Sequence, residues 1–185
     1  VNKIYKGKKE VDVIYDFVLP SPKYKAYRVT TREPFPLLFI GNYTRGKGHD
    51  LAIQAVKHIR DNYPEIGICL RIYGSDFGYA PNIIYRKFLS DYIYSNGLQK
   101  CVELHDFVID IEKVVQHHDL LLNLSVAESF SFVVAEAMNF GIPVLATDSG
   151  GPGELIDHGN AGELVPFDPK FIAERVVYLL NHSAI

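Results

Sequence analysis

The sequence predicts an α/β protein in which a parallel sheet of about six strands carries helices on both faces. From residue 37 onward, apolar runs of four to seven residues alternate with longer amphipathic stretches. This spacing is typical of strand–helix–strand units, which place successive strands parallel in one sheet. Two of the runs, LLLNL at 120–124 and IPVLAT at 142–147, are almost wholly apolar, as strands covered on both faces require.

Each apolar run predicts a strand, and each amphipathic stretch predicts the helix that follows it. We expect strands near residues 37–41, 67–73, 101–104, 119–124, 143–147 and 163–165. We expect helices near residues 47–62, 81–96, 110–117, 131–140, 152–157 and 168–181. Residues 11–20, VDVIYDFVLP, predict a further short strand that Pro20 stops. Residues 21–36 contain three prolines and no periodicity, which indicates a connecting segment.

The length of 185 residues indicates one globular domain, or one domain with an appendage, and 48% of the residues are hydrophobic and 22% charged. A formal net charge of −3 argues against a general nucleic-acid or membrane-surface binder. Cys69 and Cys101 lie in apolar runs, which indicates reduced, buried thiols. No stretch approaches the about 18 apolar residues of a transmembrane helix. We therefore expect a cytoplasmic protein with no transmembrane segment and no nucleic-acid partner.

The first candidate site is GNYTRGKGHD, residues 41–50, directly after an apolar run. In an open α/β sheet, ligands bind beyond the carboxyl ends of the strands, and the N-terminus of the next helix attracts anions. Lys47 and Arg45 offer positive charge there. The P-loop pattern G-x-x-x-x-G-K is satisfied, but Gly48 stands where a P-loop needs a Ser or Thr hydroxyl for Mg²⁺. A tight turn with solvated basic side chains is the alternative, and this loop alone leaves the choice open.

The second candidate site contains two carboxylates eight residues apart, Glu128 and Glu136. A helix is expected to begin between them near Ser131, whose hydroxyl suits an N-cap. The spacing is too long for a glycosidase pair acting on one bond, but it brackets an extended ligand. An anion near the helix N-terminus with hydroxyl groups at each end is the layout of a nucleoside diphosphate sugar. The alternative is two solvated glutamates on a helix surface.

The residues around these two carboxylates favour a ligand-binding site over a solvated helix surface. Glu136 lies in FVVAEAM, an otherwise apolar helix, so its carboxylate would be desolvated without a partner. Phe130 and Phe132 flank the expected start of the helix and are interpreted as core aromatics. The next segment, DSGGPGELI, again predicts a strand end, a glycine-rich turn and the start of a helix. Its glycines would let the backbone pass close to a ligand.

These segments together resemble a known family. The chain is similar to the donor-binding domain of retaining glycosyltransferases of the GT-B fold, family 4 of the nucleotide-sugar enzymes. The resemblance covers about residues 37–167 and rests on Glu128-x7-Glu136 in ESFSFVVAEAM, followed by GIPVLAT, GGPGELI and GNAGELVPF. It implies that the predicted sheet is Rossmann-like and forms one half of a GT-B fold.

The resemblance also implies roles for individual residues. Glu136 takes the position that binds ribose hydroxyls, and Glu128 takes the catalytic position that contacts the donor sugar near the reacting centre. Val108, in HDFVID, takes the position where the backbone meets the nucleotide base. The backbone amides assigned to the diphosphate are those around Ser129, Phe130 and Ser131.

The first loop resembles the family's Gly-Arg, four residues, Lys-Gly sequence, whose Arg and Lys bind the diphosphate. Lys47 fills the lysine position, whereas Asn42 stands at the arginine position and Arg45 is the candidate substitute. Ser131 and Asp106 stand where the family commonly has glycine. Because of Asn42, a non-catalytic nucleotide-binding or interaction module of the same fold is the alternative to an enzyme.

By resemblance, the whole protein transfers a sugar, of hexosyltransferase type, from a nucleoside diphosphate sugar to an acceptor with retention. Residues 37–185 would form the donor-binding domain and residues 1–36 a remnant of the interdomain segment, with the N-terminal acceptor domain absent. The acceptor, a saccharide, a lipid-linked saccharide or another molecule, would bind through that domain, which could also hold a cytoplasmic enzyme at a membrane. No cofactor or metal is expected, because basic side chains and helix dipoles neutralise the diphosphate.

Overall fold

The computed structural model describes residues 14–20, 33–156 and 162–182. The strands are β1 Phe35–Ile40, β2 Ile68–Tyr73, β3 Val102–His105, β4 Leu120–Asn123, β5 Val144–Thr147 and β6 Gly162–Val165. The helices are α1 His49–Asn62, α2 Ala80–Ser95, α3 Ile111–Val115, α4 Phe132–Asn139, α5 Gly151–Ile156 and α6 Pro169–Asn181. The strands and helices that the sequence predicts from residue 37 onward are therefore confirmed. Among the described residues, no helix is long and apolar enough to cross a membrane.

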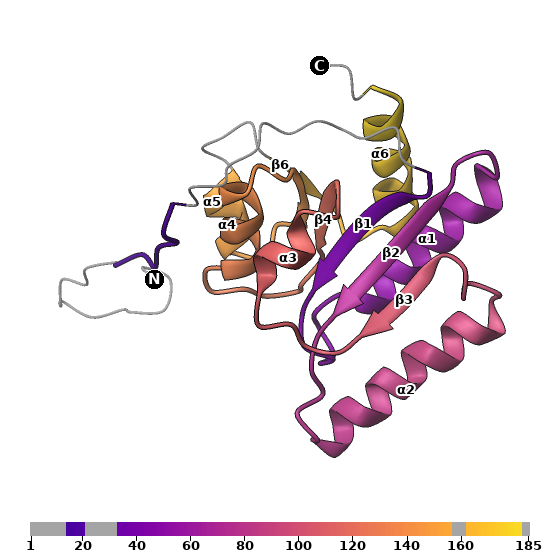
Figure 1. Ribbon diagram of the computed structural model, residues 1–185, viewed down its shortest axis with the longest axis horizontal. Coiled ribbons are helices and arrows are strands. Elements are labelled where there is room, and N and C mark those ends of the chain that lie inside the picture. The colour runs from indigo at the N-terminus through magenta and orange to yellow at the C-terminus, as the bar shows by residue number, and fades with distance from the viewer. Residues whose placement is uncertain (1–13, 21–32, 157–161, 183–185) are drawn as a thin grey trace.

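The described strands form one parallel sheet in the order β3-β2-β1-β4-β5-β6 (Figure 1). The chain builds outward from β1 to β3, then returns to the other side of β1 and builds outward again from β4 to β6. The order of the strands thus reverses between β1 and β4. At such a switch point the loops after the two strands diverge and leave a crevice, which is where open α/β sheets bind ligands.

Helices cover the sheet from both sides, which explains the apolar runs. Because successive side chains of a strand point to opposite faces, Leu37 and Phe39 pack with α1, α2 and α6, whereas Leu38 packs with α3, α4 and α5. Leu37 and Leu38 are both fully buried. The two groups of helices lie on opposite sides of the ribbon in Figure 1. β1 is therefore a central strand whose carboxyl end points into the switch point.

The loops after β1 and β4 lie in direct contact at that point. The amide of Val126 donates a hydrogen bond to the carbonyl of Gly46 at 2.8 Å. Gly48 has a φ of 85°, and a Cβ atom there would lie 2.1 Å from the carbonyl oxygen of Leu124. The Ser or Thr that a P-loop needs at this position therefore does not fit. The glycine is required by the packing of the two loops, and the P-loop interpretation is excluded.

The short strand predicted at residues 11–20 is wrong for the part that the structure describes. Residues 14–20 adopt no regular secondary structure, and residues 11–13 lie outside the described residues. Ile14 is 90% exposed and Phe17 76% exposed, so the apolar pattern of this segment finds no buried surface. The proposed interdomain remnant, residues 1–36, is otherwise largely outside the described residues, and β1 already begins at Phe35.

Two glycines of the first loop give a matched test of the loop contact. Both have a positive φ, 87° at Gly46 and 85° at Gly48, but a Cβ atom at Gly46 would meet nothing within 4 Å. We expect Gly46→Ala to lower the free energy of unfolding by about 1 kcal/mol, the cost of the left-handed conformation. Gly48→Ala should cost about 3 kcal/mol or more, because a backbone oxygen must move as well. Equal losses in urea unfolding would contradict the account of the contact.

Candidate functional site

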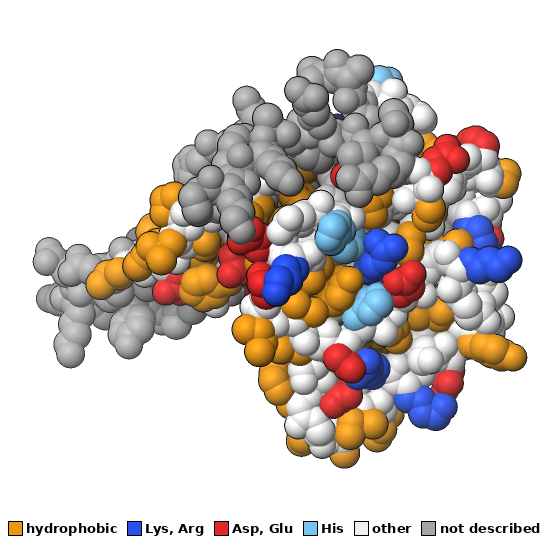
Figure 2. Space-filling model, viewed as in Figure 1, with side chains coloured by type: hydrophobic (Ala, Val, Ile, Leu, Met, Phe, Trp, Pro, Cys, Tyr) orange, Lys and Arg blue, Asp and Glu red, His pale blue; other side chains and the backbone are white. Residues whose placement is uncertain are grey.

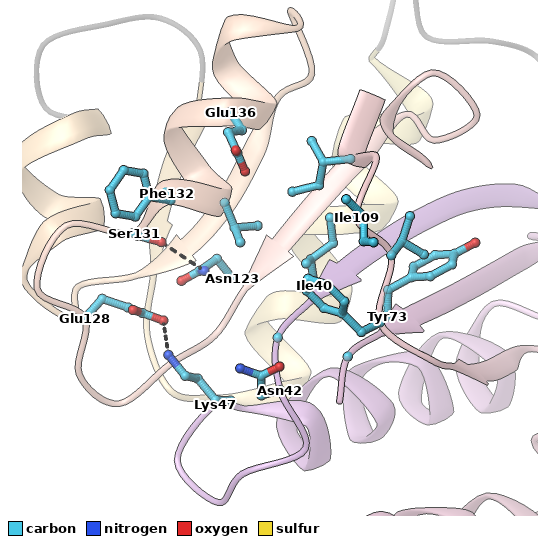
Figure 3. A pocket seen from close by; sticks show the side chains of 16 residues that line it. Ile40, Asn42, Lys47, Tyr73, Ile109, Asn123, Glu128, Ser131, Phe132 and Glu136 are labelled. Atoms are coloured by element: carbon cyan, nitrogen blue, oxygen red, sulfur yellow. Dashed lines mark hydrogen bonds and ion pairs between the residues drawn. The ribbon is translucent and has the colours of Figure 1, made fainter. Parts of the chain in front are cut away.

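A pocket of about 340 Å³ opens at the switch point between β1 and β4 (Figure 3). Its walls come from the carboxyl ends of β1, β2 and β4, the segment before α3, the loop before α4 and the first two turns of α4. Six of the residues predicted to bind the donor or act in catalysis line it, namely Asn42, Lys47, Val108, Glu128, Ser131 and Glu136. Segments that lie almost a hundred residues apart in the sequence are thereby brought to one place.

Lys47 and Glu128 form an ion pair across the pocket floor. Lys47 Nζ lies 2.8 Å from Glu128 Oε1, and the hydroxyl of Ser125 donates to the same oxygen at 2.7 Å. The Lys47 side chain is 35% exposed and that of Glu128 only 15%. Figure 3 shows the two side chains pointing toward each other from the loops after β1 and β4. The carboxylate is therefore fixed in direction, while the ammonium keeps access to solvent.

The backbone of Glu128 is held by the second glycine-rich turn. Its amide donates to the carbonyl of Ser149 at 2.8 Å, and its carbonyl accepts from the amide of Gly151 at 3.0 Å. Gly150, with a φ of 107°, lies so close that a Cβ atom would be 2.7 Å from the Glu128 carbonyl oxygen. The glycines of DSGGPGELI thus let this turn approach the Glu128 loop, and none of them lines the pocket.

A buried histidine joins the two ends of the first loop. His49, the first residue of α1, is fully buried and its Nε2–H donates to the carbonyl of Gly41 at 3.1 Å. Burial lowers the pKa of His49 to about 4, so the ring is neutral at pH 7. The hydrogen bond closes the loop from residue 41 to residue 49 and thereby limits where Lys47 can reach.

Glu136 lies in the second turn of α4, and its carboxyl group points into the pocket from the helix (Figure 3). Burial raises the pKa of Glu136, as its apolar neighbours in the sequence predict. A carboxylate that is partly desolvated gains more from hydrogen-bond donors on a ligand than a fully solvated one does. Glu136 is therefore a partly buried residue of the pocket wall.

The start of α4 differs from the prediction in two respects. Ser131 occupies the N-cap position, but its hydroxyl makes no capping hydrogen bond, since its φ of 71° and ψ of 72° are left-handed. The hydroxyl instead accepts a hydrogen bond from Asn123 Nδ2 at 3.2 Å. Phe132, interpreted as a core aromatic, is 49% exposed and lines the pocket, with its ring 5.1 Å from that of Phe130. The helix therefore begins with an uncapped turn that faces the pocket.

Not every predicted residue reaches the pocket. The guanidinium of Arg45 lies 5.0 Å from the centre of the Tyr85 ring on α2 and 5.7 Å from that of Phe88. Arg45 is absent from the pocket lining, as are Ser129 and Phe130, whose assigned contribution was through backbone amides. Asn42 lines the pocket, and its Oδ1 accepts from the amide of Ser75 at 3.3 Å. The structure thus brings Lys47 to the pocket as the basic residue of the first loop.

The family model described as "Glycosyl transferases group 1" matches residues 34–182. The chain belongs to this family. Its fold is the Rossmann-like half of a GT-B glycosyltransferase, as the sequence predicted. A curated relative, the D-inositol 3-phosphate glycosyltransferase of Paenarthrobacter aurescens, is 30% identical over 145 residues.

Two solved structures share this fold. The Anabaena protein HepE in complex with UDP and glucose aligns with a TM-score of 0.72 and 26% identity, over 82% of this chain and 40% of HepE. The C-terminal domain of the group 1 protein LpcC from Francisella tularensis aligns with a TM-score of 0.69 over 80% of this chain and 76% of that domain. At 24% identity, this second likeness concerns the fold alone.

The matches also define how much of a glycosyltransferase this chain represents. It matches 77% of its own length to the Paenarthrobacter relative, but only 34% of that relative's length. The N-acetyl-alpha-D-glucosaminyl L-malate synthase of Bacillus anthracis is matched over 48% of its length, at 25% identity. The chain thus spans about a third to a half of the length of these curated relatives.

Several pocket residues of this glycosyltransferase domain were missed from the sequence. Tyr73 and Asn123 end β2 and β4, so their place at the carboxyl ends of predicted strands was a usable signal. Phe107 and Ile109, 60% and 93% exposed, flank Val108 and give one side of the pocket an apolar lining. In Figure 3, Ile109 and Tyr73 lie on the side of the pocket opposite Glu128.

The raised pKa of Glu136 gives a pH-dependent stability that a glutamine would remove. Because the folded protein holds this proton to higher pH than the unfolded chain, ionisation of Glu136 destabilises the fold as the pH rises above the ordinary value of 4.5. We expect Glu136→Gln to be more stable than the ligand-free wild type at pH 7. The difference should shrink as the pH falls through the raised pKa. Urea unfolding from pH 4 to pH 8 measures it, and a difference that is constant with pH would contradict the role of burial.

Proposed function

We propose that this chain is the donor-binding domain of a retaining glycosyltransferase that takes its sugar from a nucleoside diphosphate sugar. The observation that carries the proposal is one pocket in which Lys47, the uncapped start of α4 and two separated carboxylates face the same space. A helix N-terminus and an ammonium favour a diphosphate in the middle. Glu128 and Glu136 then lie on either side of it, as the layout of sugar, diphosphate and ribose requires.

The polarity of the pocket walls suggests where the ribose, the base and the sugar of the ligand bind. Glu136 is assigned to the ribose hydroxyls, since a partly buried carboxylate is a strong acceptor. The apolar side with Tyr73 and Val108 suits a nucleotide base. Glu128 is assigned to the donor sugar, at the other end of the diphosphate. A carboxylate near the reacting carbon stabilises the positive charge that develops on the sugar in the transition state.

We propose UDP as the nucleotide, because HepE, at 26% identity, has been crystallised with UDP and glucose. We further propose that recognition of the diphosphate needs no metal ion, so that binding persists in the presence of a chelator. The acceptor and the second wall of the active-site cleft would come from a further domain, which closes over the donor. These assignments concern the full-length enzyme, of which this chain provides the donor half.

A non-catalytic module of the same fold is the second candidate. It is favoured by one observation: the side chain at the family's arginine position is Asn42, bonded to Ser75, and the nearby Arg45 packs on α2 instead. The diphosphate would therefore be bound by one basic side chain fewer than the family's Arg and Lys provide. Hydrolysis or transfer of the sugar from a UDP-sugar by the full-length protein separates an enzyme from this module.

Lys47→Ala tests the assignment of the diphosphate. Charge-assisted hydrogen bonds contribute roughly 1.5–3 kcal/mol, so we expect UDP to bind at least about ten-fold more weakly. Uridine, which has no phosphate, should bind as it does to the wild type. Isothermal titration of both ligands gives the comparison. Equal losses for UDP and uridine would assign Lys47 to folding.

The ion pair provides an internal control for that experiment. In Lys47→Ala the carboxylate of Glu128 loses its partner and would repel the diphosphate. Part of the lost UDP affinity should therefore return in the double variant Lys47→Ala/Glu128→Gln. This recovery is expected only in the Lys47→Ala background, where no cation lies beside the carboxylate. No recovery would show that Glu128 lies too far from the phosphates to repel them.

Substitutions of the two glutamates should have different effects on UDP binding and on turnover. Glu136→Gln removes a charged acceptor from ribose and should cost roughly 1–3 kcal/mol of UDP binding to this chain. Glu128→Gln should leave UDP affinity nearly unchanged but depress turnover of the full-length enzyme strongly, because its effect belongs to the transition state. Titration with UDP and transfer assays test both parts. If Glu128→Gln abolishes UDP binding while Glu136→Gln does not, the two roles are reversed.

A further inference from the structure

The backbone of Ser131 has an unusual conformation. Its φ of 71° lies in the left-handed region, and among the described residues the other non-glycine residue with a positive φ is Phe77. A side chain in this region is strained and persists only where its surroundings hold it in place. Ser131 is 7% exposed and stands immediately before α4. The strain is therefore located at the start of the helix that faces the pocket.

The contact that holds Ser131 comes from the sheet. Asn123, the last residue of β4, is 5% exposed, and its Nδ2–H donates to Ser131 Oγ at 3.2 Å. Figure 3 shows this bond linking the strand to the first turn of α4. The Asn123 Oδ1 atom is buried and, within the described residues, has no hydrogen-bond partner. A buried unsatisfied oxygen is costly, so the position of this amide needs an explanation beyond packing.

The direction of the hydrogen bond determines what the Ser131 hydroxyl can do. A serine hydroxyl has one proton to donate and accepts through its lone pairs. Since Oγ accepts from Asn123, its own proton stays available. In an ordinary N-cap the side-chain oxygen would instead accept from an amide of the first turn, and here no such bond forms. Both the hydroxyl proton and the first amides of α4 are thereby left for a ligand in the pocket that Lys47 also lines.

We propose that Asn123 and Ser131 act as a pair that presents the Ser131 hydroxyl as a hydrogen-bond donor to a phosphate oxygen of the nucleotide. Ser131 would contact the ligand, and Asn123 is a positioning residue that orients the hydroxyl and keeps it from capping the helix. The inference rests on the proposed function and extends it. It supplies a donor to the diphosphate at a site where Asn42 provides no positive charge and Arg45 lies elsewhere.

Ser131→Gly is the decisive variant, because glycine adopts a left-handed conformation without strain. The variant loses only the hydroxymethyl group. Relief of the left-handed strain offsets the hydrogen bond that Asn123 Nδ2 loses, so the urea midpoint should stay close to that of the wild type. We expect its affinity for UDP to fall on the order of ten-fold, with the affinity for uridine unchanged. Weaker binding together with an unimpaired fold cannot arise from general destabilisation.

A double-mutant cycle tests the pairing. Asn123→Leu keeps the side-chain size but removes the donor to Ser131, so it should weaken UDP binding in the wild-type background. In the Ser131→Gly background it should have no further effect on UDP binding, because the hydroxyl that it orients is already gone. Additive losses in the two variants would overturn the positioning role of Asn123.

The remaining outcomes separate this inference from the function on which it rests. Full UDP affinity in Ser131→Gly would overturn the inference while leaving the nucleotide assignment intact. A wild-type chain that binds neither UDP nor uridine would overturn the proposed nucleotide and, with it, the role of the pair. Weakened binding of UDP alone, with coupling between the two positions, would establish the pair.

Discussion

The site depends on one steric constraint: the loop after β1 must lie directly against the loop after β4. Gly48 permits this, since its missing side chain leaves the carbonyl of Leu124 within reach of its backbone. Lys47 is the neighbouring residue, so the same contact places its ammonium beside Glu128. The helix that follows Glu128 then faces the crevice. A larger residue at position 48 would separate the loops and with them the basic and acidic parts of the site.

Charge balance at the pocket suits a ligand that arrives with its own negative charge. Lys47 is paired with Glu128 but its side chain remains 35% exposed, so the ammonium can turn toward a phosphate while it stays close to the carboxylate. Glu128 keeps the hydroxyl of Ser125 as a partner, and its backbone is tied to the loop after β5. The carboxylate is thus the fixed member of the pair and the ammonium the adaptable one.

The sequence was sufficient for the parts of the structure that repeat a local pattern. Runs such as LLLNL predict central parallel strands because both faces must be apolar. The strand order, which periodicity does not predict, is what places GNYTRGKG next to SVAESFS. Glu136 was identifiable because a charged residue in an apolar helix is costly. These inferences need only periodicity, burial and the rule that ligands bind at the carboxyl ends of parallel strands.

The directions of side chains that leave loops were not predictable, because they depend on distant elements. Arg45 turns away from the pocket because aromatic rings of α2 attract its guanidinium. Ser131 fails as an N-cap because its backbone is left-handed and its hydroxyl is bonded to Asn123, eight residues earlier. The predicted strand before Pro20 had the right residues, but its described part is not paired with the sheet. For Arg45 and Ser131, contacts with distant elements outweighed a local expectation. The segment before Pro20 instead lacks a neighbouring strand to pair with among the described residues.

The central claim is that a nucleoside diphosphate binds at the crevice between β1 and β4. It is tested most directly by following backbone amide resonances of this chain during titration with UDP. The account predicts that the largest shifts occur at residues 131–133, at the start of α4, and at residues 107–109, on the apolar side of the pocket. Shifts concentrated instead on α2 or on α6, with the α4 amides unchanged, would contradict it.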